Sequence, residues 1–216
     1  MGNRAVITTK DKKIGIYLHW NGGRDSVEAF LEYCRLQNFR CPEVDNYGWA
    51  RFCQIVSNFF GGTSSIGVGR YDELYRDNGD NGVYIIENWH IVGREFFNGF
   101  EQNEYKLPEM LKAIDECQPS HMQLGEDFLK AEIVKTAELK IGDVVFIEDF
   151  EGYKKFTVVG FGKNEKVNGL NVEGLPFVNQ YGENNDYSKN INNYIQQNEI
   201  KRVKNEKEMI EKSSKF

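Results

Sequence analysis

Short apolar runs alternate with polar positions along the first hundred residues, which indicates a sheet built from short strands. Two such runs, at residues 5–9 and 14–20, are joined by a polar turn and predict a hairpin. Three further runs lie at residues 65–69, 82–86 and 90–93. Because the links between neighbouring runs are short, we expect a sheet of five strands that is mostly antiparallel.

Two other segments repeat their apolar residues at helical spacing. The first helix begins after residue 25 and ends near residue 38, before the Cys41-Pro42 break. The second spans residues 49–60, carries aromatic bulk on one side and stops at Gly61-Gly62. We therefore predict an α+β domain over residues 1–100, in which a mostly antiparallel sheet packs on two helices.

The pattern changes after residue 100. Residues 101–130 predict a helical connector, and residues 131–187 contain three β runs separated by glycine turns. That spacing is typical of a small SH3-like or otherwise β-rich second module. Residues 188–216 combine a short apolar stripe with many charges, which predicts a C-terminal helix or tail.

Composition narrows the range of functions. The 216 residues carry a net charge of −6, and 40% of them are hydrophobic, as in a folded protein. The acidic excess lies in residues 101–160, which hold 13 acidic and 7 basic side chains. This distribution argues against extensive nucleic-acid binding, which needs clustered Lys and Arg. No apolar run is long enough for a membrane span and no secretion signal is recognisable, so we expect a cytoplasmic protein without membrane contact.

The four cysteines are expected to be free thiols. Cys34, Cys41, Cys53 and Cys117 form no Cys-x-x-Cys pair, and two of them fall on apolar helix faces. A zinc site that joins the first three to a histidine is the less favoured alternative. A thiol on an apolar helix face is a poor nucleophile, so we predict no catalytic residue. The irregular spacing of the cysteines leads us to predict no metal site. We also predict no cofactor.

The segment from Asn21 to Ser26 is the strongest chemical signal in the chain. A Gly-Gly turn there leads from a strand into the first helix, with Asp25 expected as the N-cap. Backbone amides and the positive end of a helix dipole attract anions. The candidate anion or nucleotide site therefore consists of Asn21, Gly22, Gly23, Arg24 and Ser26. The alternative is a tight turn that needs only the conformational freedom of glycine.

The same segment resembles the Ser-Gly-Gly-x-Asp-Ser loop of the PP-loop ATP pyrophosphatases. Gly22, Gly23, Asp25 and Ser26 match that loop, whereas Asn21 replaces its first serine. The resemblance implies ATP binding or ATP-dependent chemistry. The expected antiparallel hairpin departs from the parallel sheet of that family. A nucleotide- or phosphometabolite-binding protein, or a PP-loop-like enzyme, is thus our alternative function.

Aromatic and acidic side chains indicate a protein-binding surface. Tyr47, Trp49 and Trp89 are residue types that dominate binding energy at interfaces. Acidic residues such as Asp77 and Asp80 would steer association with a basic partner. We predict partner contacts at these five positions.

Three segments, residues 17–33, 47–62 and 80–93, resemble an uncharacterised family of proteins from phages and mobile elements of Gram-positive bacteria. Small acidic proteins from that setting often inhibit host defence enzymes by contact. The resemblance thus implies a non-enzymatic binding protein in the host cytoplasm, with a host protein as its partner.

Overall fold

A computed structural model describes residues 2–149, 152–179, 194–195 and 199–203. The chain divides into two compact units, unit 1 from Met1 to Gly125 and unit 2 from Glu126 to Phe216. Both combine helices with mostly antiparallel sheets, so the predicted α+β class is confirmed.

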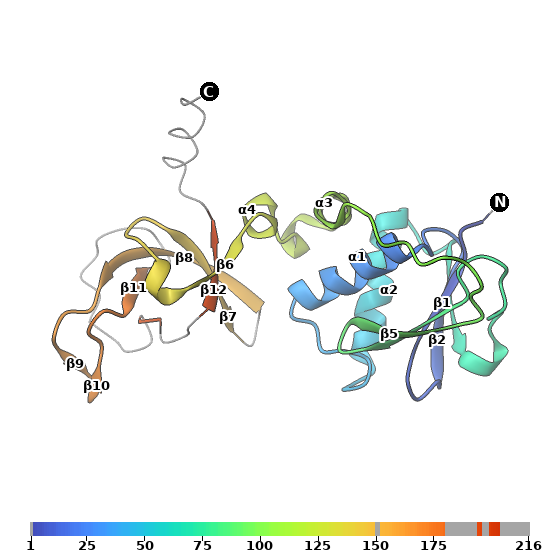
Figure 1. Ribbon diagram of the computed structural model, residues 1–216, viewed down its shortest axis with the longest axis horizontal. Helices are drawn as coiled ribbons and strands as arrows, with labels where there is room; N and C mark the ends of the chain where they lie inside the picture. Colours follow the sequence, from blue (N-terminus) through green and yellow to red (C-terminus); the bar gives the residue numbers. More distant parts are fainter. Residues whose placement is uncertain (1, 150–151, 180–193, 196–198, 204–216) are drawn as a thin grey trace, which may run out of the picture. The chain divides into compact units, whose positions relative to one another are not determined.

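Unit 1 contains the predicted five-stranded sheet (Figure 1). Its strands run in the order β3-β2-β1-β4-β5. All neighbouring pairs are antiparallel except β1 and β4, which are parallel. The chain can pair β1 with β4 in this direction because two helices and β3 intervene between them. Their bounds are β1 (Ala5–Thr9), β2 (Ile14–Leu18), β3 (Ile66–Arg70), β4 (Val83–Glu87) and β5 (His90–Glu95).

Helices α1 (Arg24–Leu36) and α2 (Tyr47–Phe60) cover one face of this sheet (Figure 1). Phe30 of α1 meets Phe52 of α2 edge to face, with ring centres 6.5 Å apart. As predicted, α2 ends at Gly61, whose φ of +70° places it in the left-handed region that favours glycine. The 3₁₀ turn η1 (Tyr71–Glu73) lies on the opposite face of the sheet. There Tyr71 packs with Val6 of β1 and Val83 of β4, both of which are buried.

The expected connector at residues 101–130 is divided between the two units. Helix α3 (Leu107–Glu116) packs on α1, and the 3₁₀ turn η2 (Ser120–Met122) follows it within unit 1. Helix α4 (Glu126–Leu129) belongs to unit 2, where Phe128 is buried against Phe146 and Tyr153. Apolar contacts therefore assign residues 101–125 to the core of unit 1 and residues 126–130 to that of unit 2.

Unit 2 is β-rich, as predicted, but its sheet is open. The five strands of this sheet run in the order β11-β8-β7-β12-β6, with all neighbours antiparallel, and β9 and β10 form a separate two-stranded sheet. In the described ranges β11 and β6 do not pair with each other, so of the two predicted forms the β-rich module is present as an open sheet and the SH3-like form, a closed barrel, is not. The bounds are β6 (Glu132–Lys135), η3 (Thr136–Glu138), β7 (Val144–Asp149), β8 (Gly152–Phe161), β9 (Lys166–Val167), β10 (Leu170–Asn171), β11 (Pro176–Asn179) and β12 (Glu199–Val203).

The predicted C-terminal helix is wrong for residues 199–203. These residues form β12, which lies between β6 and β7 and bonds to both. Pairing with two partner strands satisfies the backbone on both sides and overrides a weak local preference for helix. Apart from residues 194–195, the rest of the predicted helix lies outside the described residues.

Candidate functional site

The glycine turn before α1 is held by close backbone packing. The N–H of Gly22 donates to the carbonyl of Asn3 at 2.8 Å. A Cβ atom on Gly22 would lie 2.7 Å from that carbonyl oxygen. Asn21 adopts a left-handed φ of +52°, a region that asparagine tolerates. Gly22 is therefore required where this turn crosses the segment before β1.

The first turn of α1 uses its amides internally. Gly23, and not Asp25, is the N-cap residue, which corrects the sequence prediction. The carboxylate of Asp25 instead accepts the backbone N–H of Ser26 at 2.7 Å and its hydroxyl at 3.2 Å. The N–H of Asp25 donates to Gln102 Oε1 at 3.4 Å. Protein oxygens thus occupy three of the amides that this turn offers to a phosphate, those of Gly22, Asp25 and Ser26.

Arg24, the basic member of the predicted site, is paired with two carboxylates. Its Nη2 lies 2.8 Å from Glu28 Oε1, and its Nη1 lies 3.3 Å from Glu101 Oε2. Glu101 also accepts two bonds from Nη1 of Arg94, at 2.8 and 2.9 Å. No local pattern in the sequence singles out Arg94 or Glu101, because they lie 70 and 77 residues beyond Arg24.

The predicted partner residues do not form one exposed surface. Trp49 and Trp89 are only 7% and 4% exposed, so they are core residues and the prediction that they contact a partner is corrected. Trp89 packs parallel to Phe52, which explains its burial. Tyr47 is 65% exposed, so its side chain remains accessible to a partner.

The two predicted acidic positions also differ from each other. Asp77 is exposed, whereas Asp80 is partly buried and its carboxylate accepts a hydrogen bond from Arg4 Nε at 2.6 Å. This bond from Arg4 lowers the pKa of Asp80. Asp80 therefore serves to fix the chain before β1.

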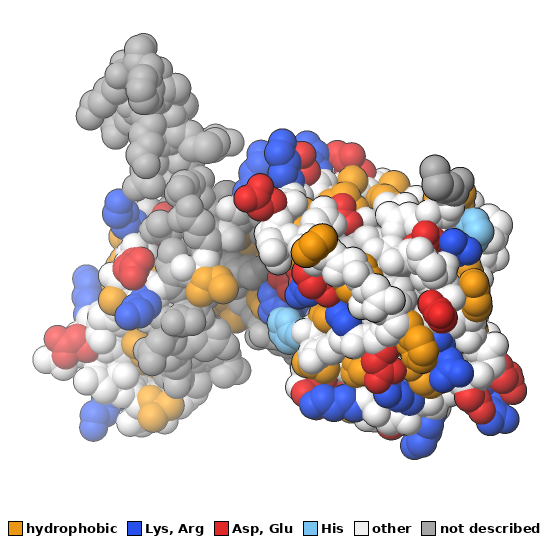
Figure 2. All heavy atoms as spheres, turned by 45° about the vertical axis from the view of Figure 1, so that its right-hand side comes forward, with side chains coloured by type: hydrophobic (Ala, Val, Ile, Leu, Met, Phe, Trp, Pro, Cys, Tyr) orange, Lys and Arg blue, Asp and Glu red, His pale blue; other side chains and the backbone are white. Residues whose placement is uncertain are grey.

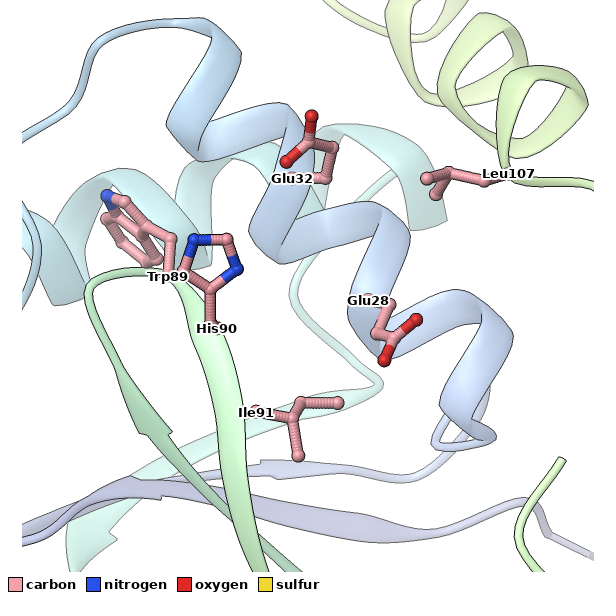
Figure 3. Close-up of a pocket in the computed structure, with 6 residues that line it drawn as sticks. All are labelled: Glu28, Glu32, Trp89, His90, Ile91 and Leu107. Atoms are coloured by element: carbon pink, nitrogen blue, oxygen red, sulfur yellow. The ribbon is translucent and has the colours of Figure 1, made fainter. Parts of the chain in front are cut away.

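A pocket of about 250 Å³ lies between α1, the β4–β5 hairpin and the start of α3 (Figure 3). Figure 3 shows Glu28 and Glu32 one helical turn apart on α1, with His90 across from them on β5. The remaining lining residues are Trp89, Ile91 and Leu107. The pocket thus combines apolar walls with two carboxylates and an imidazole.

The two carboxylates differ in how many of their oxygens already accept a hydrogen bond. Both oxygens of Glu32 accept bonds from Arg35 at 2.6 Å. Glu28 is bound to Arg24 only through Oε1, and in the described part of the chain its Oε2 has no hydrogen-bond partner. A carboxylate oxygen beside apolar walls suits a donor at the end of an apolar stem, as in Lys or Arg.

The cysteines lie outside this pocket. Burial raises the pKa of Cys34 and raises that of Cys53 to about 11. Such thiols are poor nucleophiles at neutral pH. Over the described residues, no three His, Cys, Asp or Glu side chains are grouped so that they could hold a metal ion. No helix within those same ranges combines the length and apolarity needed to cross a bilayer.

The fold and the pocket define a two-unit α+β protein with a small, partly acidic pocket. Comparisons with protein-family models, curated proteins and solved structures find no match.

Proposed function

We propose that the protein is a non-enzymatic binding protein that acts by direct contact, and that the pocket receives a basic side chain of its partner. The pocket supports this proposal most directly. Its volume of about 250 Å³ lies below the roughly 300–1,000 Å³ of typical small-molecule sites. One Lys or Arg side chain suits that space better than a nucleotide.

The contacts expected in the pocket follow from its lining. An ammonium or guanidinium group would donate to Glu28 Oε2, while its apolar stem would pack on Ile91 and Leu107. Such a pair would be partly desolvated, which makes it stronger than an exposed ion pair.

The proposed target is a host protein of a Gram-positive bacterium, as the resemblance to phage and mobile-element proteins implies. The contact would cover a basic functional site on that protein and so inhibit it.

 Figure 2 shows acidic and basic side chains interspersed over the visible face of unit 1. Steering by charge would therefore be local to the pocket, and the complex should weaken as salt is raised. A nucleotide-binding function through the Asn21–Ser26 turn has less support, because protein oxygens already occupy three of its amides and two carboxylates pair with Arg24.

The test is an affinity pull-down of the full chain from a Gram-positive bacterial lysate, followed by a binding titration with the recovered protein. Glu28→Gln removes the charge that would hold the basic group, and Leu107→Lys places a cation in the pocket. Each should weaken binding by about tenfold or more, because a charge pair is lost or a like charge is added.

Two matched controls separate the pocket from general effects of charge. Glu73→Gln removes an exposed carboxylate on η1, and Met110→Lys adds a cation to α3 outside the pocket lining. Both should bind as the wild type does. Equal recovery of the same partner by all four variants would contradict the proposal.

A further inference from the structure

The loop between β5 and α3 places one carboxylate between two arginines. Glu101 Oε2 lies 2.9 Å from Nη1 of Arg94 and 3.3 Å from Nη1 of Arg24. Arg94 comes from β5 and Arg24 from the first turn of α1, so two distant segments direct guanidinium groups at the same oxygen. Guanidinium groups that converge in this way are suited to phosphate as well as to carboxylate.

Both arginines are also held by groups outside this loop. The guanidinium carbon of Arg94 lies 3.8 Å from the ring centre of Tyr84, and its Nη2 donates to the carbonyl of Asn81. Arg24 is bonded to Glu28 at 2.8–2.9 Å. The two cations are therefore fixed in part without Glu101, and such preorganisation favours binding of another anion in its place.

Two buried polar atoms lie at the same cluster. Tyr84 Oη and Arg94 Nε are buried without a hydrogen-bond partner in the described ranges. Tyr84 is fully buried under the Arg94 guanidinium, and the charges of Arg94, Glu101, Arg24 and Asp25 all act on its hydroxyl, which places that group near the cluster. Burial raises the pKa of Tyr84, which keeps the hydroxyl protonated and able to donate. A further acceptor oxygen would satisfy it.

We propose that Arg24 and Arg94 form a binding site for a small phosphate compound, either orthophosphate or a phosphate monoester, which Glu101 occupies as an internal competitor. Phosphate offers more acceptor oxygens than a carboxylate and could bind both arginines and the Tyr84 hydroxyl together. This site uses side chains, unlike the amide site predicted at the glycine turn. It also goes beyond the proposed function, which depends on the pocket.

The test is isothermal titration of the full chain with sodium phosphate at constant ionic strength. Glu101→Gln removes the competing charge, whereas Glu104→Gln makes the same change at an exposed position of the same loop. If Glu101 fills the site at least nine-tenths of the time, its removal should tighten phosphate binding about tenfold or more. Glu104→Gln should bind phosphate as the wild type does.

Equal phosphate affinity of Glu101→Gln and Glu104→Gln would overturn the proposal. So would an unchanged affinity after Arg94→Met is added to Glu101→Gln. Circular dichroism checks the fold of each variant, and if Glu101→Gln does not fold, Glu101→Asp decides. The shorter acid should also bind phosphate more tightly than the wild type, and an unchanged affinity counts against the site. Acetate at the same ionic strength should bind more weakly, since equal binding would contradict selectivity for phosphate.

Discussion

The hydroxyl of Tyr33 donates a hydrogen bond of 2.6 Å to the carboxylate of Asp115, which joins α1 to α3 in the interior of unit 1. Asp115 also accepts the backbone N–H groups of Leu124 and Gly125, at 2.7 and 3.0 Å. One buried carboxylate thus fixes two helices and the last residues of the unit. Bonds to a buried charged group are among the stronger polar contacts in proteins.

Asp115→Asn should therefore destabilise the protein. The asparagine side chain keeps one acceptor oxygen, but its NH₂ group would face a donor whose hydrogen bond the second carboxylate oxygen now accepts. We therefore expect a loss of about 2–3 kcal/mol in the free energy of unfolding. Urea denaturation measures this loss. Glu116→Gln is the control, because this neighbouring carboxylate is exposed and its removal should change stability by no more than about 0.5 kcal/mol. Similar effects of the two variants would show that the buried network contributes little.

Gly22→Ala tests whether the glycine turn serves close packing. The new Cβ would lie 2.7 Å from backbone atoms of residues 3–5, which cannot move aside as a flexible side chain can. We expect a loss of about 3 kcal/mol or more. Gly67→Ala in β3 is the matched control, since its Cβ would meet Tyr17 Cβ at an ordinary 3.5 Å. Thermal denaturation should place the Gly67 variant near the wild type. A Gly22 variant of wild-type stability would refute the packing argument.

Local sequence signals predicted the parts of the fold that depend on neighbouring residues. The hairpin of β1 and β2 and the end of α2 at Gly61 are examples, because a polar turn and a left-handed glycine act within a few residues. The parallel pairing of β1 with β4 joins segments more than 70 residues apart, and no local pattern specifies it. Sequence periodicity could therefore predict the elements better than their pairing.

The candidate site depended even more on distant contacts. Trp89 was expected at a surface, but its Nε1 donates to the carbonyl of Phe39 at 2.7 Å and its ring packs on Phe52. Glu101 lies 3.3 Å from Arg24 although 77 residues separate the two along the chain, so only the tertiary fold brings them together. The predicted turn was found where expected, whereas the charges that surround it depend on tertiary structure.

Thiol reactivity provides a test of burial. Because the pKa of Cys53 is raised to about 11, roughly one in a thousand of its thiols is ionised at pH 8, and burial also raises the pKa of Cys34 and Cys41. Cys117 is exposed. Ellman's reagent should therefore modify one thiol rapidly in the native protein and all four in denaturant. Cys117→Ser should abolish the rapid phase. A second rapid thiol in that variant would contradict the burial of the other three.

The ion pair between Arg4 and Asp80 should make part of the stability dependent on pH. The bond from Arg4 lowers the pKa of Asp80 in the folded protein below its ordinary value of about 4 in the unfolded chain. The stabilisation is therefore complete above the unfolded pKa and is lost as the pH falls through the lower folded pKa. At pH 7, Asp80→Asn should melt at a lower temperature than the wild type.

The difference in melting temperature between wild type and Asp80→Asn should shrink as the pH falls from 7 to below 4, because protonation removes the same charge from the wild type. Differential scanning calorimetry across this range measures the difference directly. Asp77→Asn is the matched control: it removes an exposed carboxylate from the same loop and should lower the melting temperature little at either pH. A difference for Asp80→Asn that stays constant or widens in acid would show that Arg4 binds the protonated side chain equally well, and the pair would then contribute hydrogen bonding without charge.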